Sequence, residues 1–311
     1  MTAGREKPAR VTVLLSTYNG ARFLPQQLRS LYEQTYPDVR ILVRDDGSTD
    51  STRSILDSEH SRGCLDLLEE HSKLGPARSF FELLRSAAST DTEYVAFCDQ
   101  DDVWLPQKIE HAVTALSSVT GSTPAMYCSR AEIVDEQLKH IRYTDIPRRI
   151  GFGNALVENV AIGCTTVLNR GAVELVCKNL PGKVLIHDWW CYLVISCFGK
   201  IVFDKNSGIK YRQHGNNAFG ASRNIVENVV RKLRRFSAGN RGHLWLSEQA
   251  MAFSSIFKEL IPLPHSHLLG VFVAAKSSLL RRIQLAFSPE IWRQKRSDSV
   301  ILRLLVLINR I

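Results

Sequence analysis

The sequence lacks paired cysteines. Its seven cysteines include no CxxC spacing, and the chain has no internal repeat or low-complexity run. This favours small buried cysteines in a reducing compartment over a zinc site or a disulfide framework. The first ten residues are polar and charged, so the apolar segment of a secretory signal is missing. The longest uncharged stretch, residues 260–275, has 16 residues and two prolines, which is too short and broken for a transmembrane helix.

Positive charge is concentrated in the last third of the 311 residues. Residues 1–220 contain 25 Lys and Arg against 26 Asp and Glu, whereas residues 221–311 contain 15 against 5. The C-terminal part therefore carries the whole excess, which indicates an anionic surface as its partner. A nucleic-acid partner is disfavoured, because the first 220 residues are near neutral and contain clusters of carboxylates.

Short apolar runs alternate with helical patterns in the first 120 residues. The runs at 11–15, 41–44 and 94–98 predict buried strands, and the segments between them predict amphipathic helices. Such alternation is typical of a parallel sheet covered by helices on both faces. Polar clusters follow each of these strands, and ligands of such sheets bind at the carboxyl ends of the strands.

The pattern from residue 120 onward is mixed. Strands are expected at 125–134, 159–169, 201–204 and 208–214, and a helix is expected at 187–199. Beyond residue 220 the chain is typical of helices with basic residues among apolar ones. The sequence therefore predicts an α/β fold with a mixed sheet flanked by helices, followed by a basic helical segment.

The acidic motif DQDD follows the strand expected at 94–98. It contains Asp99, Asp101 and Asp102, and carboxylates two residues apart after a strand can reach one hard cation. Mg²⁺ and Mn²⁺ prefer oxygen ligands and often share them with substrate phosphates. A solvated acidic loop or a helix cap is the alternative interpretation.

The motif DDGSTD follows the strand expected at 41–44. Asp-Gly favours a turn and Ser or Thr favours a helix cap, which together explain most of the motif. One of the two adjacent acids could also accept a hydrogen bond from a nucleotide base.

Two further motifs carry candidate chemistry. In HDWW, Asp188 could act as a general base, and Trp189 and Trp190 could offer flat surfaces to a sugar or lipid acceptor. The alternative is a helix cap with core tryptophans. In YRQHGNN, Arg212 suits diphosphate oxygens and neutral His214 could complete a metal shell. A structural histidine is the alternative there.

Taken together, STYNG, RDDGSTD, DQDD, HDWW and YRQHGNN resemble the motifs of family 2 glycosyltransferases, in the same order. The resemblance is stronger to the bacterial rhamnosyltransferase-like branch that builds surface polysaccharides, and it covers residues 11–220. It implies a GT-A fold over residues 1–220, with a nucleotide-sugar half at about 10–120 and an acceptor-side half at about 121–220. Residues 221–311 then form the basic helical segment.

The resemblance also implies a role for each matching residue. Asp188 would be the catalytic base, Asp101 and His214 would bind Mg²⁺ or Mn²⁺, and Arg212 and His214 would contact the diphosphate. Trp189 and Trp190 remain the acceptor-binding candidates. The donor nucleotide would contact Thr17, Tyr18, Asn19, Asp46 and Asp99. The chain departs from many relatives at Lys73, Phe80 and Phe81, where an Asn and an Arg-Asn pair are common, so no base-contacting arginine is expected there.

The implied reaction is inverting transfer of a sugar from a nucleotide-sugar donor to a saccharide or lipid-linked saccharide. The lead donor is dTDP-L-rhamnose, a UDP-hexose is the alternative, and a sugar-phosphate nucleotidyltransferase is a more distant one. A dinucleotide-binding oxidoreductase is disfavoured, because Gly151-Phe152-Gly153 lacks a third glycine and a clear preceding strand.

A cytoplasmic enzyme, peripheral at the inner face of the cell membrane, is expected from the basic segment. Its apolar stretches at 268–287 and 299–311 contain arginines, and a basic cluster lies at Arg231, Lys232, Arg234 and Arg235. Helices of this kind can lie in the interface of an anionic leaflet. A helical subdomain packed on the core is the alternative.

Overall fold

The structure is a computed structural model, and it describes residues 8–69, 72–215 and 246–311. The strands are β1 (Val11–Thr17), β2 (Val39–Asp45), β3 (Asp66–Leu67), β4 (Tyr94–Cys98), β5 (Val103–Trp104), β6 (Ala125–Val134), β7 (His140–Tyr143), β8 (Val167–Asn169) and β9 (Lys200–Arg212). The helices are α1 (Leu24–Tyr32), α2 (Thr52–Ser61), α3 (Pro76–Ala88), α4 (Lys108–Ser117), α5 (Phe152–Ala155), the 3₁₀ turn η1 (Gly163–Thr165), α6 (Arg170–Cys177), α7 (His187–Phe198), α9 (Leu246–Phe257), α10 (Leu263–Ala274), α11 (Leu279–Phe287) and α12 (Arg296–Leu307).

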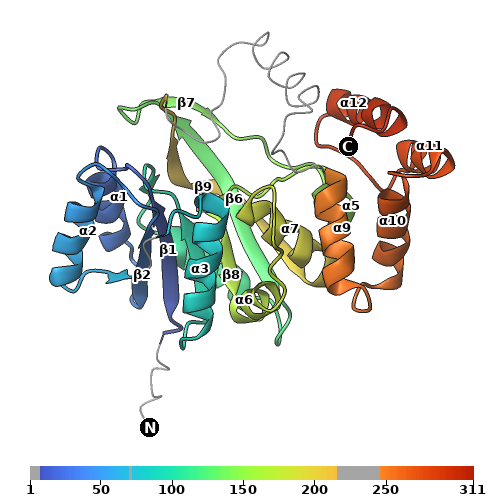
Figure 1. Ribbon diagram of the computed structural model, residues 1–311. Coiled ribbons are helices and arrows are strands. Elements are labelled where there is room, and N and C mark those ends of the chain that lie inside the picture. Colours follow the sequence, from blue (N-terminus) through green and yellow to red (C-terminus); the bar gives the residue numbers. More distant parts are fainter. Residues whose placement is uncertain (1–7, 70–71, 216–245) are drawn as a thin grey trace.

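One mixed sheet forms the centre of the molecule, with helices on both of its faces (Figure 1). Its strand order is β3-β2-β1-β4-β8-β6-β9-β5, and β7 pairs with β6 beside this path. Strands β1, β2 and β4 are parallel, so their carboxyl ends meet at one edge. Strand β8 runs antiparallel to β4 and β6, which makes the sheet mixed. The predicted fold class is confirmed.

Three expected strands have different limits in the structure. The apolar run 159–169 contains a strand only at β8, because the chain first makes the tight η1 turn. The run 201–204 and residues 208–212 of the run 208–214 belong to one long strand, β9, whose pairing with β6 shifts register near Arg130. The polar residues between these two runs are typical of a turn, but the irregular pairing keeps them within the strand.

The core has two layers because side chains alternate along the strands. In β1, Val11, Val13 and Leu15 pack with α1, α2 and α4 on one face of the sheet. Leu14 packs on the other face with α3, α6 and α7. The loops that follow β1, β2 and β4 are thereby fixed between two buried layers.

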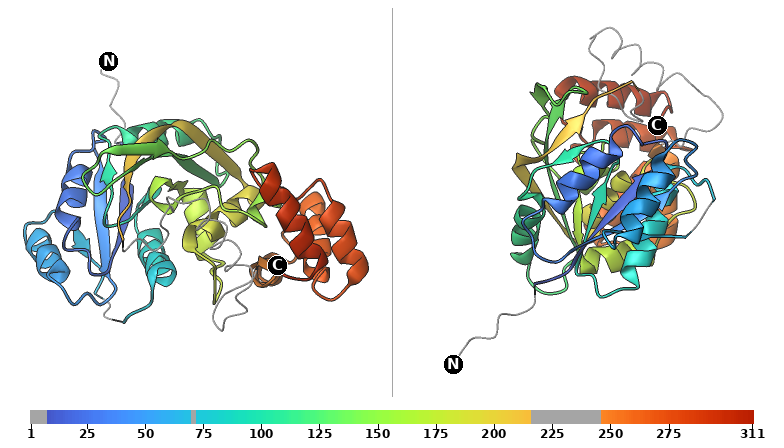
Figure 2. Two further views of the ribbon diagram at one scale, coloured as in Figure 1. Left: turned by 90° about the horizontal axis from the view of Figure 1, so that it is seen from above. Right: turned by 90° about the vertical axis from the view of Figure 1, so that its left-hand side faces the viewer.

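Helices α9 and α10 continue the core beyond α7. The ring centroid of Trp190 on α7 lies 5.9 Å from that of Phe253 and 6.4 Å from that of Phe257, both on α9. Leu268 and Phe272 of α10 are buried in the same cluster. Helices α10, α11 and α12 lie at the opposite end of the molecule from α1 and α2 (Figures 1 and 2).

Candidate active site

The loops after β1 and β2 are joined by hydrogen bonds. Thr17 Oγ1 donates to Asp45 Oδ1 at 2.8 Å, and the backbone N–H of Asn19 donates to Ser48 Oγ at 2.8 Å. Asn19 has a φ of 48°, a left-handed conformation that asparagine tolerates better than most residues. The motifs STYNG and DDGSTD therefore lie side by side in two connected loops, as their positions after parallel strands predict.

Tyr18 lies in the first of these loops, directly after β1. Gln100 of the DQDD motif bonds both its backbone N–H (2.8 Å) and its carbonyl (3.0 Å), while its ring stays 41% exposed. Lys73 Nζ lies 2.8 Å from the Tyr18 hydroxyl and 4.0 Å from the ring centroid. Sequence analysis noted Lys73 only as a departure from relatives, because nothing in the pattern links it to a residue 55 positions earlier.

Asp46 has a structural role that the sequence analysis does not predict. Its Oδ1 accepts from the Arg44 guanidinium and from Leu74 N, each at 2.7 Å, and its Oδ2 accepts from Gly75 N at 2.8 Å. Both Asp46 and Arg44 are buried. These three bonds leave part of the acceptor capacity of the carboxylate unused, so the contact of Asp46 with the nucleotide base stays a prediction. Asp46 holds the loop that carries Lys73.

The predicted pair Asp101 and His214 is brought together. His214 Nε2 lies 2.7 Å from Asp101 Oδ2, and both side chains are largely shielded from solvent. A carboxylate and an imidazole at this separation are both ligand types that Mn²⁺ accepts, and the carboxylate also suits Mg²⁺. The residues therefore fit a divalent cation.

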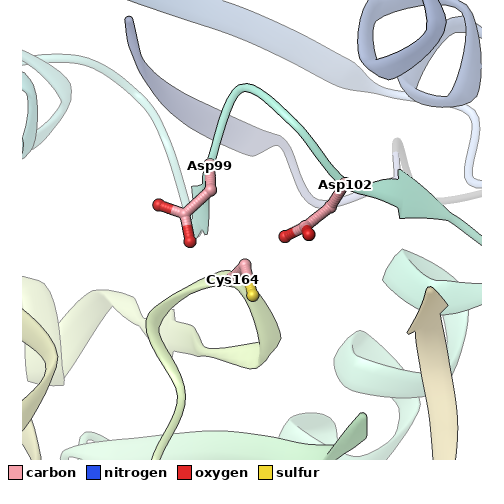
Figure 3. Close-up of side chains that lie close together, drawn as sticks. All are labelled: Asp99, Asp102 and Cys164. Carbon is pink, nitrogen blue, oxygen red and sulfur yellow. The ribbon is translucent and has the colours of Figure 1, made fainter. Parts of the chain in front are cut away.

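A second group of possible ligands lies beside this pair (Figure 3). The ligand atoms of Asp99, Asp102 and Cys164 all lie within 4.8 Å of one another. Burial raises the pKa of both carboxyl groups, and the negative charge of Asp101 raises them further. Sequence analysis assigned no role to Asp102 and treated Cys164 as a small buried side chain. The turn η1, which delivers Cys164, had been expected to be part of a strand.

Arg212 makes hydrogen bonds within the protein that the sequence analysis does not predict. Its backbone N–H donates to Asp102 Oδ1 at 2.9 Å, its Nε donates to the Asp101 carbonyl at 2.8 Å, and one Nη donates to Gln26 Oε1 at 2.5 Å. The other Nη donates to the carbonyl of Glu136. The guanidinium is buried and bonded at all three nitrogens, and its contact with the diphosphate stays a prediction. Arg212 positions the acidic loop.

Asp188 lies in the first turn of α7 and is almost fully buried. Its Oδ1 accepts from the backbone N–H of Trp189 at 2.6 Å. Gly163 makes room for it, because a Cβ there would lie 3.4 Å from Asp188 Oδ2 and 3.0 Å from His187 Nε2. Burial raises the pKa of Asp188 to about 7, although the N–H groups of Trp189 and Gly163 and the side chain of Asn159 favour the carboxylate.

The two tryptophans of HDWW differ in environment. Trp190 is completely buried against α9, so its assignment as an acceptor-binding surface is wrong. Trp189 is partly exposed, and its Nε1 donates to the carbonyl of Ala155 at 2.7 Å. His187 is buried and stacks on Phe80, with ring centroids 4.0 Å apart, and burial lowers its pKa to about 3. His187 is therefore a neutral packing residue.

The candidate site thus combines a buried carboxylate of raised pKa with a nearby acidic cluster. Asp188, in the first turn of α7, is close enough to Asp99, which follows β4, for its negative charge to raise the pKa of Asp99. Such an arrangement can remove a proton on one side and hold a cation for an anionic group on the other.

Comparisons with known proteins show what the chain is similar to. Residues 12–175, more than half of the chain, match the family model described as Glycosyl transferase family 2. The dTDP-rhamnosyl transferase RfbG of Shigella flexneri is 27% identical over 224 residues, which cover 67% of this chain and 74% of that protein. The UDP-Glc:alpha-D-GlcNAc-diphosphoundecaprenol beta-1,3-glucosyltransferase WfgD of Escherichia coli is 29% identical over 159 residues, covering 51% of this chain and 59% of that one.

Solved structures show the same fold. TarS of S. aureus, residues 1–349, superposes with a TM-score of 0.53 at 14% identity and covers 97% of this chain and 80% of its own. Its complex with UDP-GlcNAc gives a TM-score of 0.52 at 13% identity, with 96% and 90% covered. The expected GT-A fold is confirmed.

Proposed function

The chain belongs to glycosyl transferase family 2, and we propose that it transfers L-rhamnose from dTDP-L-rhamnose to a saccharide or lipid-linked saccharide, with inversion at the anomeric carbon. The similarity to a dTDP-rhamnosyl transferase supports this donor. A UDP-hexose is the second candidate, supported by the similarity to a UDP-Glc-dependent enzyme that acts on a diphosphoundecaprenol-linked sugar. A sugar-phosphate nucleotidyltransferase remains the more distant alternative.

The observation that carries the proposal is the position of Asp188. It is a buried carboxylate with a pKa of about 7, and its charge raises the pKa of Asp99 in the acidic cluster after β4. A general base is most effective when its pKa is close to the working pH. Only one carboxylate has to act on the acceptor, whereas a glycosidase needs two that flank the sugar.

In the proposed reaction, an acceptor hydroxyl attacks the anomeric carbon of the donor. The bond between that carbon and the acceptor oxygen forms while the bond to the nucleoside diphosphate breaks. A carboxylate oxygen of Asp188 takes the acceptor proton, and the bonding electrons leave with the diphosphate. A cation held by Asp101 and His214 would stabilise the negative charge that the diphosphate gains.

The donor nucleotide is proposed to lie along the joined loops after β1 and β2. Tyr18 offers an exposed ring for stacking on a base, and Lys73 places a cation beside that ring. Thr17, Asn19 and Asp99 complete the proposed nucleotide side. Trp189, the partly exposed tryptophan of HDWW, is proposed to contact the acceptor sugar.

The experiment that tests the donor is a hydrolysis screen with the purified chain. dTDP-L-rhamnose, UDP-glucose and UDP-GlcNAc are each offered with Mn²⁺, and released nucleotide is measured. Hydrolysis of dTDP-L-rhamnose at least tenfold faster than of the others is expected. Faster hydrolysis of a UDP-sugar would contradict dTDP-L-rhamnose as the donor and favour the UDP-sugar. Pyrophosphate exchange without sugar transfer would favour a nucleotidyltransferase.

We also propose that the enzyme works at an anionic membrane surface on the cytoplasmic side. No helix in the part of the chain that the structure describes is long and apolar enough to cross a bilayer. Residues 246–311 contain nine basic and four acidic residues, a balance that suits an anionic leaflet. The basic cluster from Arg231 to Arg235 lies outside the described residues.

A further inference from the structure

Helices α11 and α12 each leave an apolar stripe uncovered. On α11 the exposed apolar residues are Leu279, Leu280, Ile283 and Phe287, and on α12 and its C-cap they are Val300, Ile301, Leu304 and Ile308. Both sets have the same spacing, i, i+1, i+4 and i+8. At about 100° per residue each set falls within a sector of about 100°, so each is one face of its helix.

The residues of these stripes are separate from the buried residues that pack each helix on the core. Leu280 and Phe287 are 78% and 70% exposed, whereas Leu285 of α11 and Leu302 of α12 are buried and hold the two helices to the rest of the fold. Each helix therefore has a buried side and a separate exposed apolar side. Exposed apolar patches of this kind mark a surface that has a partner.

The charges around the stripes indicate what that partner is. Helix α11 contains the exposed Arg281 and no acidic residue, and the only acidic residue of α12, Asp298, is buried. Arg310 is exposed one turn beyond the end of α12. Apolar stripes bordered by arginines suit the interface of an anionic bilayer, whereas a second copy of this face would bring like charges together.

We propose that α11 and α12 form a membrane-docking face, in which the eight stripe residues insert among the acyl chains and the exposed Arg281 and Arg310 bind anionic lipid headgroups. The proposal rests on the proposed function, because an enzyme with a lipid-linked acceptor has to reach the membrane. It deepens that function by assigning attachment to two helices of the described structure.

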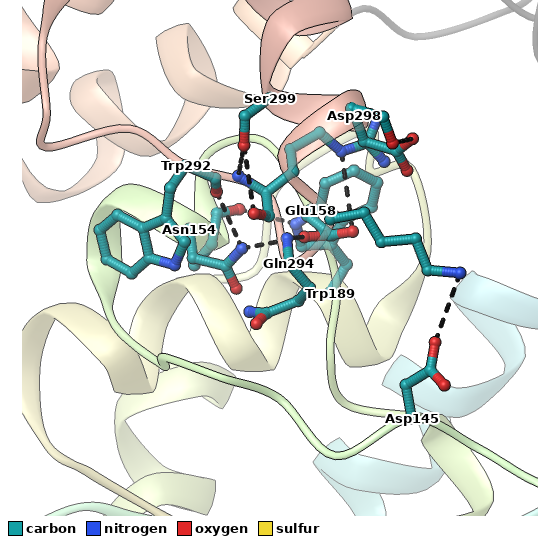
Figure 4. A network of polar contacts seen from close by, with 12 residues as sticks. Asp145, Asn154, Glu158, Trp189, Trp292, Gln294, Asp298 and Ser299 are labelled. Atoms are coloured by element: carbon teal, nitrogen blue, oxygen red, sulfur yellow. Dashed lines mark hydrogen bonds and ion pairs between the residues drawn. The ribbon is translucent and has the colours of Figure 1, made fainter.

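A polar network fixes this face relative to the active site (Figure 4). In the segment between α11 and α12, the backbone N–H of Gln294 donates to Glu158 Oε2 at 2.6 Å. Asn154 Nδ2 donates to the same oxygen at 3.1 Å and to the Trp292 carbonyl at 3.0 Å. The Tyr192 hydroxyl on α7 donates to Asn154 Oδ1 at 2.8 Å. Since α7 also carries Asp188, the docking face has a fixed position relative to the candidate base.

The test is sedimentation of the full chain with vesicles, either one-third phosphatidylglycerol in phosphatidylcholine or phosphatidylcholine alone. The stripe variant is Leu280→Ser/Leu304→Ser. The matched control is Ile141→Ser/Met251→Ser, which removes two half-exposed apolar side chains from β7 and α9. We expect partitioning of the stripe variant to anionic vesicles to fall about tenfold or more, and that of the control to change less than about twofold.

A third variant separates charge from apolar insertion. Arg281→Gln/Arg310→Gln should remove most of the preference for anionic over neutral vesicles, and high salt should weaken the wild type in the same way. Thermal unfolding confirms that each variant is folded, and donor hydrolysis without vesicles should be unchanged in all of them. That hydrolysis tests the proposed function independently of attachment.

Equal binding of the stripe variant and the control would overturn the proposal, as would absence of wild-type binding to anionic vesicles. Self-association of the wild type that the stripe variant loses, measured by analytical ultracentrifugation without lipid, would assign the face to a second copy. If the wild type binds vesicles but does not hydrolyse any donor, the result would count against the proposed function and would still support the docking face.

Discussion

His214 Nε2 lies 2.7 Å from Asp101 Oδ2, although the two residues are 113 positions apart in the chain. The contact joins the end of β9 to the loop after β4. Arg212, two residues before His214, bonds the same loop through its backbone and its guanidinium. The metal-binding candidates are therefore held by a rigid strand on one side and by a buried arginine on the other.

Asp101→Asn should abolish turnover and the metal-dependent part of donor affinity, and EDTA should silence the wild type. The amide is a weaker ligand for a hard cation than the carboxylate. Titration of Mn²⁺ in the presence of dTDP measures the effect. His140→Ala is the matched control, because His140 also contacts a carboxylate, that of Glu132 at 2.9 Å. Full activity without a divalent cation would contradict the proposal that Asp101 and His214 hold a metal needed for turnover.

Asp46→Ala should destabilise the fold by roughly 3–5 kcal/mol, because it takes the carboxylate from the buried Arg44 guanidinium. It also leaves the N–H groups of Leu74 and Gly75 without their acceptor oxygens. Asp57→Ala is the control, since its pair with Arg53 is exposed and should contribute less than about 1 kcal/mol. Urea unfolding compares the two. Equal losses would show that Asp46 does not anchor the loop.

Asp188 should make the stability of the protein depend on pH. Its pKa is about 7 in the fold against about 3.9 in an unfolded chain, so the folded state binds the proton more tightly. The stabilisation that the protonated Asp188 gives to the folded state is present at pH 4 and is lost as pH rises to 7. The stability of Asp188→Asn relative to the wild type should therefore increase by up to about 4 kcal/mol between pH 4 and pH 8. A difference that does not change with pH would contradict the raised pKa.

The two tryptophans of HDWW should respond differently to truncation. Trp190→Ala should destabilise the core by roughly 3–5 kcal/mol, because its ring is buried against Phe253 and Phe257. Trp189→Ala should raise the acceptor KM several-fold while donor hydrolysis persists. Steady-state kinetics at fixed donor concentration measure this. If acceptor KM is unchanged in Trp189→Ala, the ring serves only to bond Ala155.

Much of this arrangement can be predicted from the sequence. The three apolar runs before STYNG, DDGSTD and DQDD are buried strands, and parallel pairing brings the three motifs to one edge of the sheet. The positions of these three motifs follow from strand periodicity, which is a local property of the chain. The proximity of Asp101 and His214 was instead implied by the resemblance to family 2 glycosyltransferases.

The sequence does not show which protein partner a polar or aromatic group finds. Arg44 near the end of β2 donates to the carboxylate of Asp46, the first residue after that strand. Trp190 lies in a run that is apolar on all sides, so helical periodicity cannot tell its buried face from an exposed one. The commitment of Arg212 depends on Gln26 and Glu136, which are distant in the sequence.

The central claim is that Asp188 removes the acceptor proton, and Asp188→Asn tests it most directly. The amide keeps the shape of the side chain but cannot take the proton. Turnover at saturating donor and acceptor should fall about 10²–10⁴-fold, while the affinity for dTDP-L-rhamnose changes little. The wild-type kcat should fall tenfold per pH unit below about pH 7, as the carboxylate is protonated. Collapse of donor affinity with kcat preserved at saturation would contradict the claim and make Asp188 a binding residue.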